Sequence, residues 1–358
     1  MPQLVSKNMR YSELNEKSTI GRSWRFYTIA LIISGFLIVS TFKLIWKNPT
    51  VQLNAWKNRL VGYSEHKAAF IDSSGYLRSV LSPDLRWCTA NPFLKPYNQS
   101  VVLALELKWV VWQRNQLRTT YEILKNYALQ IGDWGGGIVH LAYPPSLPLP
   151  CPYKNNLTRI GGIHDGNKII CGIEIFTPLT KCIVYSLGSF GNFNFEWDLL
   201  KRTSCEVHTY DCTSPPPGGK TERMTYHQIC LGDTSKLQKF MYPYNTQKEN
   251  IIFNNESLFK RFDTILTENK HDEVHILKMD IEGGEYSVFS DLLCQTNKTN
   301  LPYQISFESH WWNRDIYHAI LHQKMFSQFW TAGYRILQHE YNPGDHTCVE
   351  WTLMRVFC

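Results

Sequence analysis

The stretch CIVYSLGSFGNFNFE at residues 182–196 decides the fold. Its first part, residues 182–187, is mostly apolar and rich in residues that favour extended backbone, so it predicts a buried strand. Residues 193–202 predict a helix. Between them, Gly188 and Gly191 let the backbone turn tightly and approach a ligand, beside the amide groups of the helix N-terminus. The stretch therefore predicts a strand, a ligand-binding turn and a helix that open an α/β domain.

The rest of the C-terminal half repeats this alternation of short apolar runs and helical stretches. Further strands are predicted at residues 206–210, 226–231, 274–279 and 304–307, and helices at residues 257–268, 285–293 and 316–332. Two last runs, at 334–338 and 348–356, flank an Asn-Pro-Gly-Asp turn and predict an antiparallel hairpin. This order is typical of βαβ units, so the sequence predicts an α/β fold with a mostly parallel sheet.

One strongly apolar run precedes this domain, at residues 26–46. About 20 helical residues cross the hydrocarbon of a bilayer, and Trp24, Tyr27 and Trp46 lie at the two ends, where amphipathic rings prefer the interface. A cleavable signal peptide is the alternative, but no A-x-A site follows the run. We therefore expect a transmembrane signal-anchor helix, with a cytoplasmic tail at residues 1–25 and a lumenal C-terminal part.

The part after residue 46 carries features of a lumenal protein. Its four glycosylation sequons begin at Asn98, Asn156, Asn255 and Asn297. All ten cysteines also lie there, without a C-x-x-C pair, and an even number permits disulfides in an oxidising compartment. Cys182, Cys205 and Cys230 lie in or beside apolar runs, so they are interpreted as buried thiols, and no pairing is assigned.

Prolines divide this C-terminal part. Residues 47–150 are expected to form a stem and a helical covering region, in which residues 101–128 predict an amphipathic helix. Five prolines at positions 144, 145, 148, 150 and 152 interrupt helix and strand alike. A domain boundary near residue 150 follows, with the globular domain at residues 151–358.

Two aspartates follow the second and third predicted strands and could add contacts to a ligand bound at the glycine turn. Asp211 could accept hydrogen bonds from both ribose hydroxyls of a bound nucleoside. Asp233 could meet the adenine amino group or cap a helix. The turn lacks the middle glycine of the G-x-G-x-x-G pattern, which disfavours a pyrophosphate cofactor such as NAD. S-adenosylmethionine, a nucleoside cofactor without phosphates, fits these residues better.

A second group of polar residues is predicted at the same edge of the sheet. Asp280 and Glu282 follow one predicted strand, and Glu308 and His310 follow the next. Such carboxylates and an imidazole could deprotonate an acceptor or hold a divalent cation. Glu285 is interpreted as a cap of the helix that it begins.

Two further features argue against other kinds of site. His318 and His322 are four residues apart on a predicted helix and could chelate a metal, but a solvated helix face is the favoured interpretation. The net charge of +6 is spread along the chain without long basic runs, so no nucleic-acid partner is expected.

Several motifs, in this order, resemble a known family. They are CIVYSLGSFGNFNFE, the strand that ends at Asp211, LKMDIEGGEYSVF and ISFESHWW, and they follow a segment, GGIHDGNKIICG, that also resembles the family. Together they resemble the methyltransferase-like protein 24 type of methyltransferase domain, itself similar to FkbM-type enzymes with a D-x-E-G-x-E signature. The resemblance implies a class I (Rossmann-like) methyltransferase fold with a seven-stranded sheet, one antiparallel strand from the final hairpin, and S-adenosylmethionine as donor.

These observations lead to one expected function and two alternatives. We expect a type II membrane methyltransferase of the secretory pathway that methylates an oxygen, with Asp280, Glu308 and His310 on the acceptor side and His310 or Glu308 as base. A membrane-tethered domain on a stem is the layout of Golgi enzymes that modify glycans, so a sugar hydroxyl is the expected acceptor. The alternatives are a nucleotide-sugar glycosyltransferase, with Asp280-Ile281-Glu282 as a D-x-D motif, and a non-catalytic interaction protein.

Overall fold

The computed structural model describes residues 99–127, 143–144, 148–153, 157–163, 166–177, 181–219, 222–232, 256–295, 300–311, 316–342, 345 and 347–357. The chain divides into two compact units, residues 1–72 and 73–358, and all of these residues belong to the second. The predicted anchor at residues 26–46, the asparagines of the four sequons and Asp233 lie outside the described residues. Among the described helices, none combines the length and the hydropathy that a membrane span needs.

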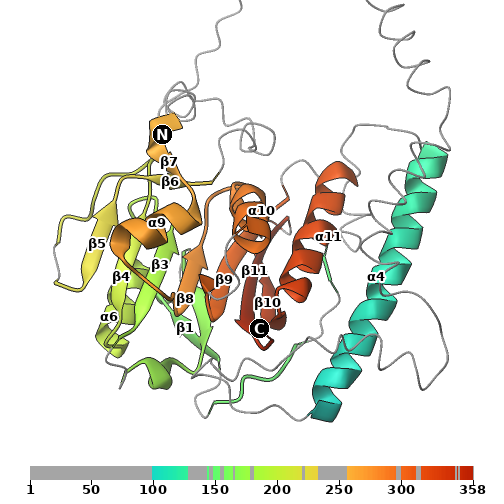
Figure 1. Cartoon of the computed structure of the whole chain (residues 1–358), viewed down its shortest axis with the longest axis horizontal. Coiled ribbons are helices and arrows are strands. Elements are labelled where there is room, and N and C mark those ends of the chain that lie inside the picture. The colour runs from blue at the N-terminus through green and yellow to red at the C-terminus, as the bar shows by residue number, and fades with distance from the viewer. Residues whose placement is uncertain are drawn as a thin grey trace, which may run out of the picture. The chain divides into compact units, whose positions relative to one another are not determined.

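A seven-stranded sheet forms the centre of the second unit (Figure 1), in the order β10-β11-β9-β8-β3-β4-β5. The strands are β3 (Ile183–Leu187), β4 (Glu206–Tyr210), β5 (Met224–His227), β8 (Ile276–Met279), β9 (Gln304–His310), β10 (Tyr334–Tyr341) and β11 (Cys348–Arg355). Neighbours from β9 through β5 run parallel, and β11 is antiparallel to both β9 and β10. The structure thus confirms the mostly parallel sheet and its antiparallel C-terminal hairpin.

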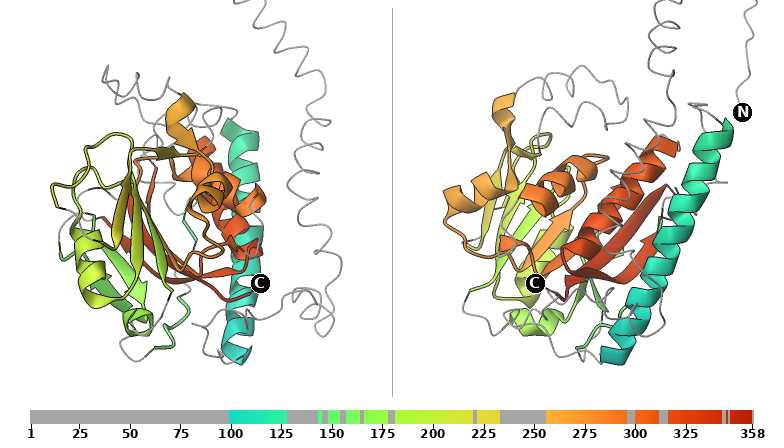
Figure 2. Two further views of the ribbon diagram at one scale, coloured as in Figure 1. Left: turned by 60° about the vertical axis from the view of Figure 1, so that its left-hand side comes forward. Right: turned by 45° about the vertical axis from the view of Figure 1, so that its right-hand side comes forward.

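Each face of the sheet carries its own core, because successive strand residues point to opposite faces. The covering elements are β1 (Leu157–Ile160), β2 (Lys168–Cys171), α6 (Asn194–Arg202), α9 (Phe262–Asn269), α10 (Glu285–Gln295), α11 (Ile316–Thr331) and two 3₁₀ turns, Ile173–Phe176 and Glu256–Leu258. Ile183, Tyr185 and Leu187 of β3 pack with α9, α10 and α11. Val184 packs with α6 and the β1–β2 hairpin. The result is a three-layered α/β domain (Figures 1 and 2).

A long helix, α4 (Gln99–Tyr127), lies beside α11 (Figures 1 and 2) and confirms the helix predicted at residues 101–128. Trp109 stacks on Trp330 with ring centroids 4.4 Å apart. Glu106 forms a 2.6 Å ion pair with Arg335, and both side chains are buried. These contacts give α4 a covering role on the domain. The domain boundary near residue 150 stays a prediction.

Two predicted elements differ from the structure between β5 and β8. The strand predicted at residues 226–231 is divided, because the chain turns after His227, where the Ile229 amide bonds to the His227 carbonyl at 2.9 Å. Its second half, β6 (Cys230–Leu231), leaves the main sheet and pairs with β7 (Phe259–Lys260). The helix predicted at residues 257–268 is therefore shorter, since a 3₁₀ turn and β7 occupy its first residues.

The interpretation of Cys182, Cys205 and Cys230 as buried thiols is wrong. Among the described residues, disulfides join Cys151 to Cys171, Cys182 to Cys205 and Cys212 to Cys230. Ile183 pairs with Glu206 in the register of β3 and β4, which places the preceding residues, Cys182 and Cys205, side by side. Apolar surroundings therefore reflected the burial of these sulfur atoms and carried no information about their pairing.

The solvated face expected at His318 and His322 is also wrong. The two side chains are 5% and 0% exposed. They face α10 across the helix pair, where Tyr286 of α10 contacts both imidazole rings and bonds to His322 Nδ1. Two polar residues four apart lie on the same face of a helix, but their spacing does not show whether another element covers that face. Here α10 covers it.

Candidate functional site

The predicted site residues within the described ranges gather at the carboxyl edge of the sheet. Gly188 follows β3, Asp211 follows β4 and Asp280 follows β8. Glu308 and His310 are among the last three residues of β9 and pair with the first residues of β11. Parallel strands present their carboxyl ends along one edge, which is where open α/β sheets bind ligands.

The glycines of the turn after β3 have different local roles. Gly188 has a φ of 76°, and a Cβ added to it would come within 1.7 Å of the Asp280 carbonyl oxygen. Glycine is therefore required for the close approach of the chains that leave β3 and β8. Gly191 has a φ of 78°, and an added Cβ would meet nothing within 4 Å. The backbone at Gly191 thus borders open space that a ligand could occupy.

Asp211 organises this turn. Its Oδ2 accepts hydrogen bonds from the amides of Ser189 and Phe190 at 2.9 and 2.7 Å and from the Ser189 hydroxyl at 3.0 Å. Its Oδ1 accepts bonds from the amide and hydroxyl of Thr213 and from the amide of Ser214. Burial alone would raise the pKa of Asp211, but these donors hold it well below the usual range.

These bonds bear on the predicted ribose contact. A carboxylate offers about four lone-pair positions, and Asp211 already accepts bonds from four residues of its own chain. A ribose diol would have to replace donors of the turn. The structure therefore gives Asp211 a role in shaping the turn, and its contact with a nucleoside stays a prediction.

Two buried lysines lie at this edge of the sheet. Lys168, from β2, forms ion pairs with Asp280 at 3.0 Å and Glu350 at 2.7 Å, and its side chain is fully buried. Lys278, from β8, donates a hydrogen bond to the Gly188 carbonyl oxygen. The β1–β2 hairpin and β11 thus contribute charges to the site as well as the parallel strands do.

His310 lies among four carboxylates. Its Nδ1 is 2.9 Å from Glu285, while its Nε2 lies 3.9 Å from Asp280, 3.6 Å from Glu282 and 3.8 Å from Glu308. Glu285 also accepts bonds from the amides of the turn that precedes α10. The predicted capping by Glu285 is confirmed, and the same carboxylate orients the His310 ring.

These surroundings shift the pKa values of the predicted catalytic residues. Burial and the charge of Asp280 raise the pKa of Glu308 to about 8. Burial alone would lower the pKa of His310, but the carboxylates around it, above all Glu285, raise it to about 10. Burial would likewise raise the pKa of Asp280, but Lys168 and other cations lower it to about 2. At neutral pH, His310 is therefore a cation, and Glu308 is the group that titrates near neutrality.

Three overlapping groups at this edge have the composition of a cation site. They are Asp280 with Glu282 and His310, Asp280 with Glu308 and Glu350, and Glu308 with His310 and Cys348. Within each group the candidate ligand atoms lie within 4.8 Å of one another. Carboxylate oxygens suit Mg²⁺ or Mn²⁺, and the imidazole and thiol would favour a softer metal.

Lys168 and Glu350 were not predicted from the sequence. Both are charged residues within mostly apolar strands, KIIC and CVEWTLMR. A charge in such a run is a signal of buried pairing, because an isolated buried charge is strongly unfavourable. The sequence gives no indication of the partner, since Lys168 and Asp280 meet only through the fold.

The chain was compared with known proteins. A model of a methyltransferase domain family matches residues 149–355. No curated protein matches the chain. Among solved structures, a fibrillarin pre-rRNA processing protein from Methanococcus jannaschii matches with a TM-score of 0.30 and 10% identity over 51% of this chain and 68% of that chain. A ribosomal protein L11 methylase from Lactobacillus delbrueckii subsp. bulgaricus matches with a TM-score of 0.25 and 10% identity over 52% of this chain and 75% of that one.

The family match covers more than half of the chain, from residue 149, which precedes β1, to residue 355, which ends β11. It includes every described residue of the site, and the mostly parallel sheet with its antiparallel hairpin is a Rossmann-like methyltransferase fold. The chain belongs to this methyltransferase domain family.

Proposed function

We propose that this protein is an S-adenosylmethionine-dependent O-methyltransferase. The observation that carries the proposal is the contact between the two halves of the site. Gly188 of the proposed donor side approaches the carbonyl of Asp280, whose carboxylate belongs to the proposed acceptor side. A donor and an acceptor bound at these two places would be neighbours at one sheet edge.

The turn after β3 is the proposed donor site. The open space beside Gly191 and the short turn at Gly188 fit a ligand that lies against the backbone. When bound, S-adenosylmethionine would supply an electrophilic methyl group on its sulfonium. Asp211 would hold the turn and exchange one or more of the donors of Ser189 and Phe190 for ribose hydroxyls.

Glu308 is the proposed base on the acceptor side. A hydroxyl loses its proton as its oxygen is methylated, and a base works best when its pKa lies near the working pH. Glu308, with a pKa raised to about 8, meets this condition, whereas His310 stays protonated. His310 and Lys168 would instead balance the charge of the surrounding carboxylates. A divalent cation in the same cluster would be an alternative way to polarise the hydroxyl.

The compartment is proposed from the covalent structure. Three disulfides in the described residues support folding in the secretory pathway, because disulfides persist in oxidising compartments. We extend the proposal to a single-pass protein, anchored by residues 26–46, whose lumenal domain methylates a hydroxyl such as that of a glycan in the Golgi. The resemblance to the methyltransferase-like protein 24 type supports S-adenosylmethionine as the donor. No nucleic-acid acceptor is proposed.

Calorimetric titration of the full-length chain with S-adenosylmethionine and S-adenosylhomocysteine tests the donor. We expect micromolar binding, and Gly191→Val should weaken it at least tenfold because the added side chain fills the open space. Gly162→Val is the matched control, since Gly162 also has a positive φ and open surroundings but lies after β1. Absence of binding to folded wild-type protein, with or without Mg²⁺, would overturn the proposal and direct attention to nucleotide sugars or a non-catalytic role.

A further inference from the structure

A second group of metal-ligating side chains lies away from the candidate site. It consists of Glu206, His208 and His271, and we call it the His208 cluster. Glu206 begins β4, and His208, two residues further, points to the same face of the sheet. His271 follows the C-cap of α9 and precedes β8. The cluster therefore involves the beginning of β4 and the approach to β8, whereas the candidate site lies where these strands end.

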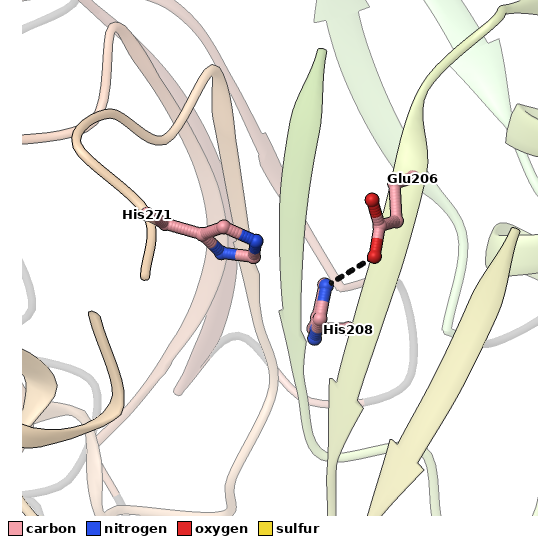
Figure 3. A group of neighbouring side chains, drawn as sticks. All are labelled: Glu206, His208 and His271. Atoms are coloured by element: carbon pink, nitrogen blue, oxygen red, sulfur yellow. Dashed lines mark hydrogen bonds and ion pairs between the residues drawn. The ribbon is translucent and has the colours of Figure 1, made fainter. Parts of the chain in front are cut away.

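The three side chains converge on a common point. Figure 3 shows the His271 ring projecting toward His208, and the dashed line joins His208 Nε2 to a Glu206 carboxylate oxygen at 2.9 Å. One candidate ligand atom from each residue lies within 4.8 Å of the other two. Zinc bonds to nitrogen and oxygen ligands are about 2.0–2.2 Å long, so small inward movements of these side chains would let the three atoms share one ion.

The other ring nitrogen of each histidine is held by the protein. His208 Nδ1 lies 3.1 Å from His227 Nε2, and His271 Nδ1 lies 2.8 Å from the Tyr185 hydroxyl. Asn269 fixes that hydroxyl in turn, at 3.2 Å. When each Nδ1 donates its proton to these partners, each Nε2 keeps a lone pair that can bind a metal. Metal-binding histidines are generally oriented by a partner in this way.

The donor set indicates the metal. Two imidazoles and one carboxylate are typical zinc ligands, and three protein ligands leave one tetrahedral position for water. Water can reach that position from the side of Glu206, whose side chain is 49% exposed. His208, by contrast, is buried and 5% exposed. We propose that the His208 cluster binds a Zn²⁺ ion, which links β4 to the turn after α9.

Metal counting and titration test this proposal. The tag-free full-length chain is stripped with a chelator, titrated with ZnCl₂ by calorimetry, and its bound zinc is counted by mass spectrometry. His271→Gln and Glu206→Gln remove one ligand each, and because the Glu206 side chain is 49% exposed, we expect its variant to fold as the wild type does. His339→Gln is the matched control, because His339 is another partly buried histidine, stacked on Trp351.

We expect both ligand variants to bind one zinc ion fewer than the wild type, or to bind that ion at least tenfold more weakly, and the control to bind as the wild type does. Counting the difference separates this ion from one held by the carboxylates around His310. Cobalt(II) should give visible bands of a tetrahedral site in the wild type that His271→Gln loses. Equal zinc binding by the wild type and both ligand variants, or no binding by the folded wild type, would overturn the proposal.

Discussion

At the scale of single residues, Asp211 shows how one side chain can have a structural role at a position where a ligand contact was predicted. It follows β4 and binds the amides of Ser189 and Phe190 in the neighbouring turn. These bonds fix the backbone around Gly188 before any ligand arrives. Preorganisation of this kind lowers the entropy that a bound ligand must lose, so the structural role and a role in binding support each other.

Replacing Asp211 with asparagine should destabilise the protein by about 2 kcal/mol at pH 7, because a charged acceptor of several buried hydrogen bonds is lost. The pKa of Asp211 is lower in the folded protein than in the unfolded chain, so its contribution is present above about pH 4 and is lost as the pH falls. Urea unfolding at pH 7 and pH 3 should therefore show a difference between wild type and variant that shrinks in acid.

Asp272→Asn is the control for this measurement. The Asp272 side chain is 93% exposed, so its replacement should change the stability by less than about 0.5 kcal/mol. Equal stability of Asp211→Asn and the wild type at pH 7 would show that the bonds to the turn contribute nothing.

Glu308 should control the pH dependence of methyl transfer. Its carboxyl must be ionised to accept a proton, and its pKa is raised to about 8, so kcat/KM should rise with pH and level off above about pH 8. Glu308→Gln should lower the rate roughly 10²–10⁴-fold and leave binding of S-adenosylhomocysteine unchanged. The assay follows transfer of a labelled methyl group to a hydroxyl acceptor found by screening.

Glu340→Gln is the control for this measurement. Glu340 forms a partly exposed ion pair with Arg159, and its replacement should keep the wild-type profile. A wild-type rate that does not change between pH 6 and 9 would exclude Glu308 as the base.

At the scale of elements, a buried ion pair joins α4 to β10. Glu106 neutralises Arg335 of β10, whose guanidinium also lies 3.7 Å above the Trp330 ring. Glu106→Ala leaves a buried charge without its partner and should destabilise the protein by about 3–5 kcal/mol. Replacing both residues by methionine should cost less, because no unpaired charge remains. Urea unfolding of the single and double variants measures the difference.

A second position on α4 provides the comparison. Gln113 donates a 3.0 Å hydrogen bond to Ser327 of α11, and its replacement by alanine should cost about 1 kcal/mol. If Glu106→Ala is no more damaging than Gln113→Ala, the ion pair is not what holds α4 to the domain.

The elements also show what the sequence could predict. The strands at residues 182–187 and 274–279 were found because buried parallel strands are short, mostly apolar runs, a property that is local in the sequence. The β1–β2 hairpin was missed, and with it Lys168, because the charge of this lysine is compensated by residues that are distant in the chain. The burial of His322 was missed for the same reason, since it depends on α10. Asp280, Glu308 and His310 were placed together correctly, because the carboxyl ends of successive parallel strands must share an edge.

At the scale of the whole molecule, the two edges of the sheet differ in character. The disulfide between Cys182 and Cys205 joins the starts of β3 and β4, and the His208 cluster lies close to the same end of β4. The carboxyl edge carries the glycine turn and the charged cluster. A cross-linked amino edge can hold the strands while the turns at the other edge adjust to a ligand. This division places the rigid part of the domain behind the proposed site.

The disulfides also predict the side of the membrane on which the domain lies. Three disulfides in the described residues require oxidising conditions, so the domain of the full-length protein should be protected from added protease in intact microsomes and digested after detergent is added. Treatment with a glycosidase should increase the electrophoretic mobility of the protein if the sequons are used.

A maleimide tests the disulfides directly. Added to denatured, unreduced protein, it should leave Cys182, Cys205 and Cys230 unlabelled, and peptide mass spectrometry identifies the labelled sites. A cytosolic-facing membrane protein in the same microsomes shows that the protease is active. Digestion of the domain in intact microsomes, or labelling of these three cysteines, would contradict a lumenal location, because a reducing cytosol does not maintain such bonds.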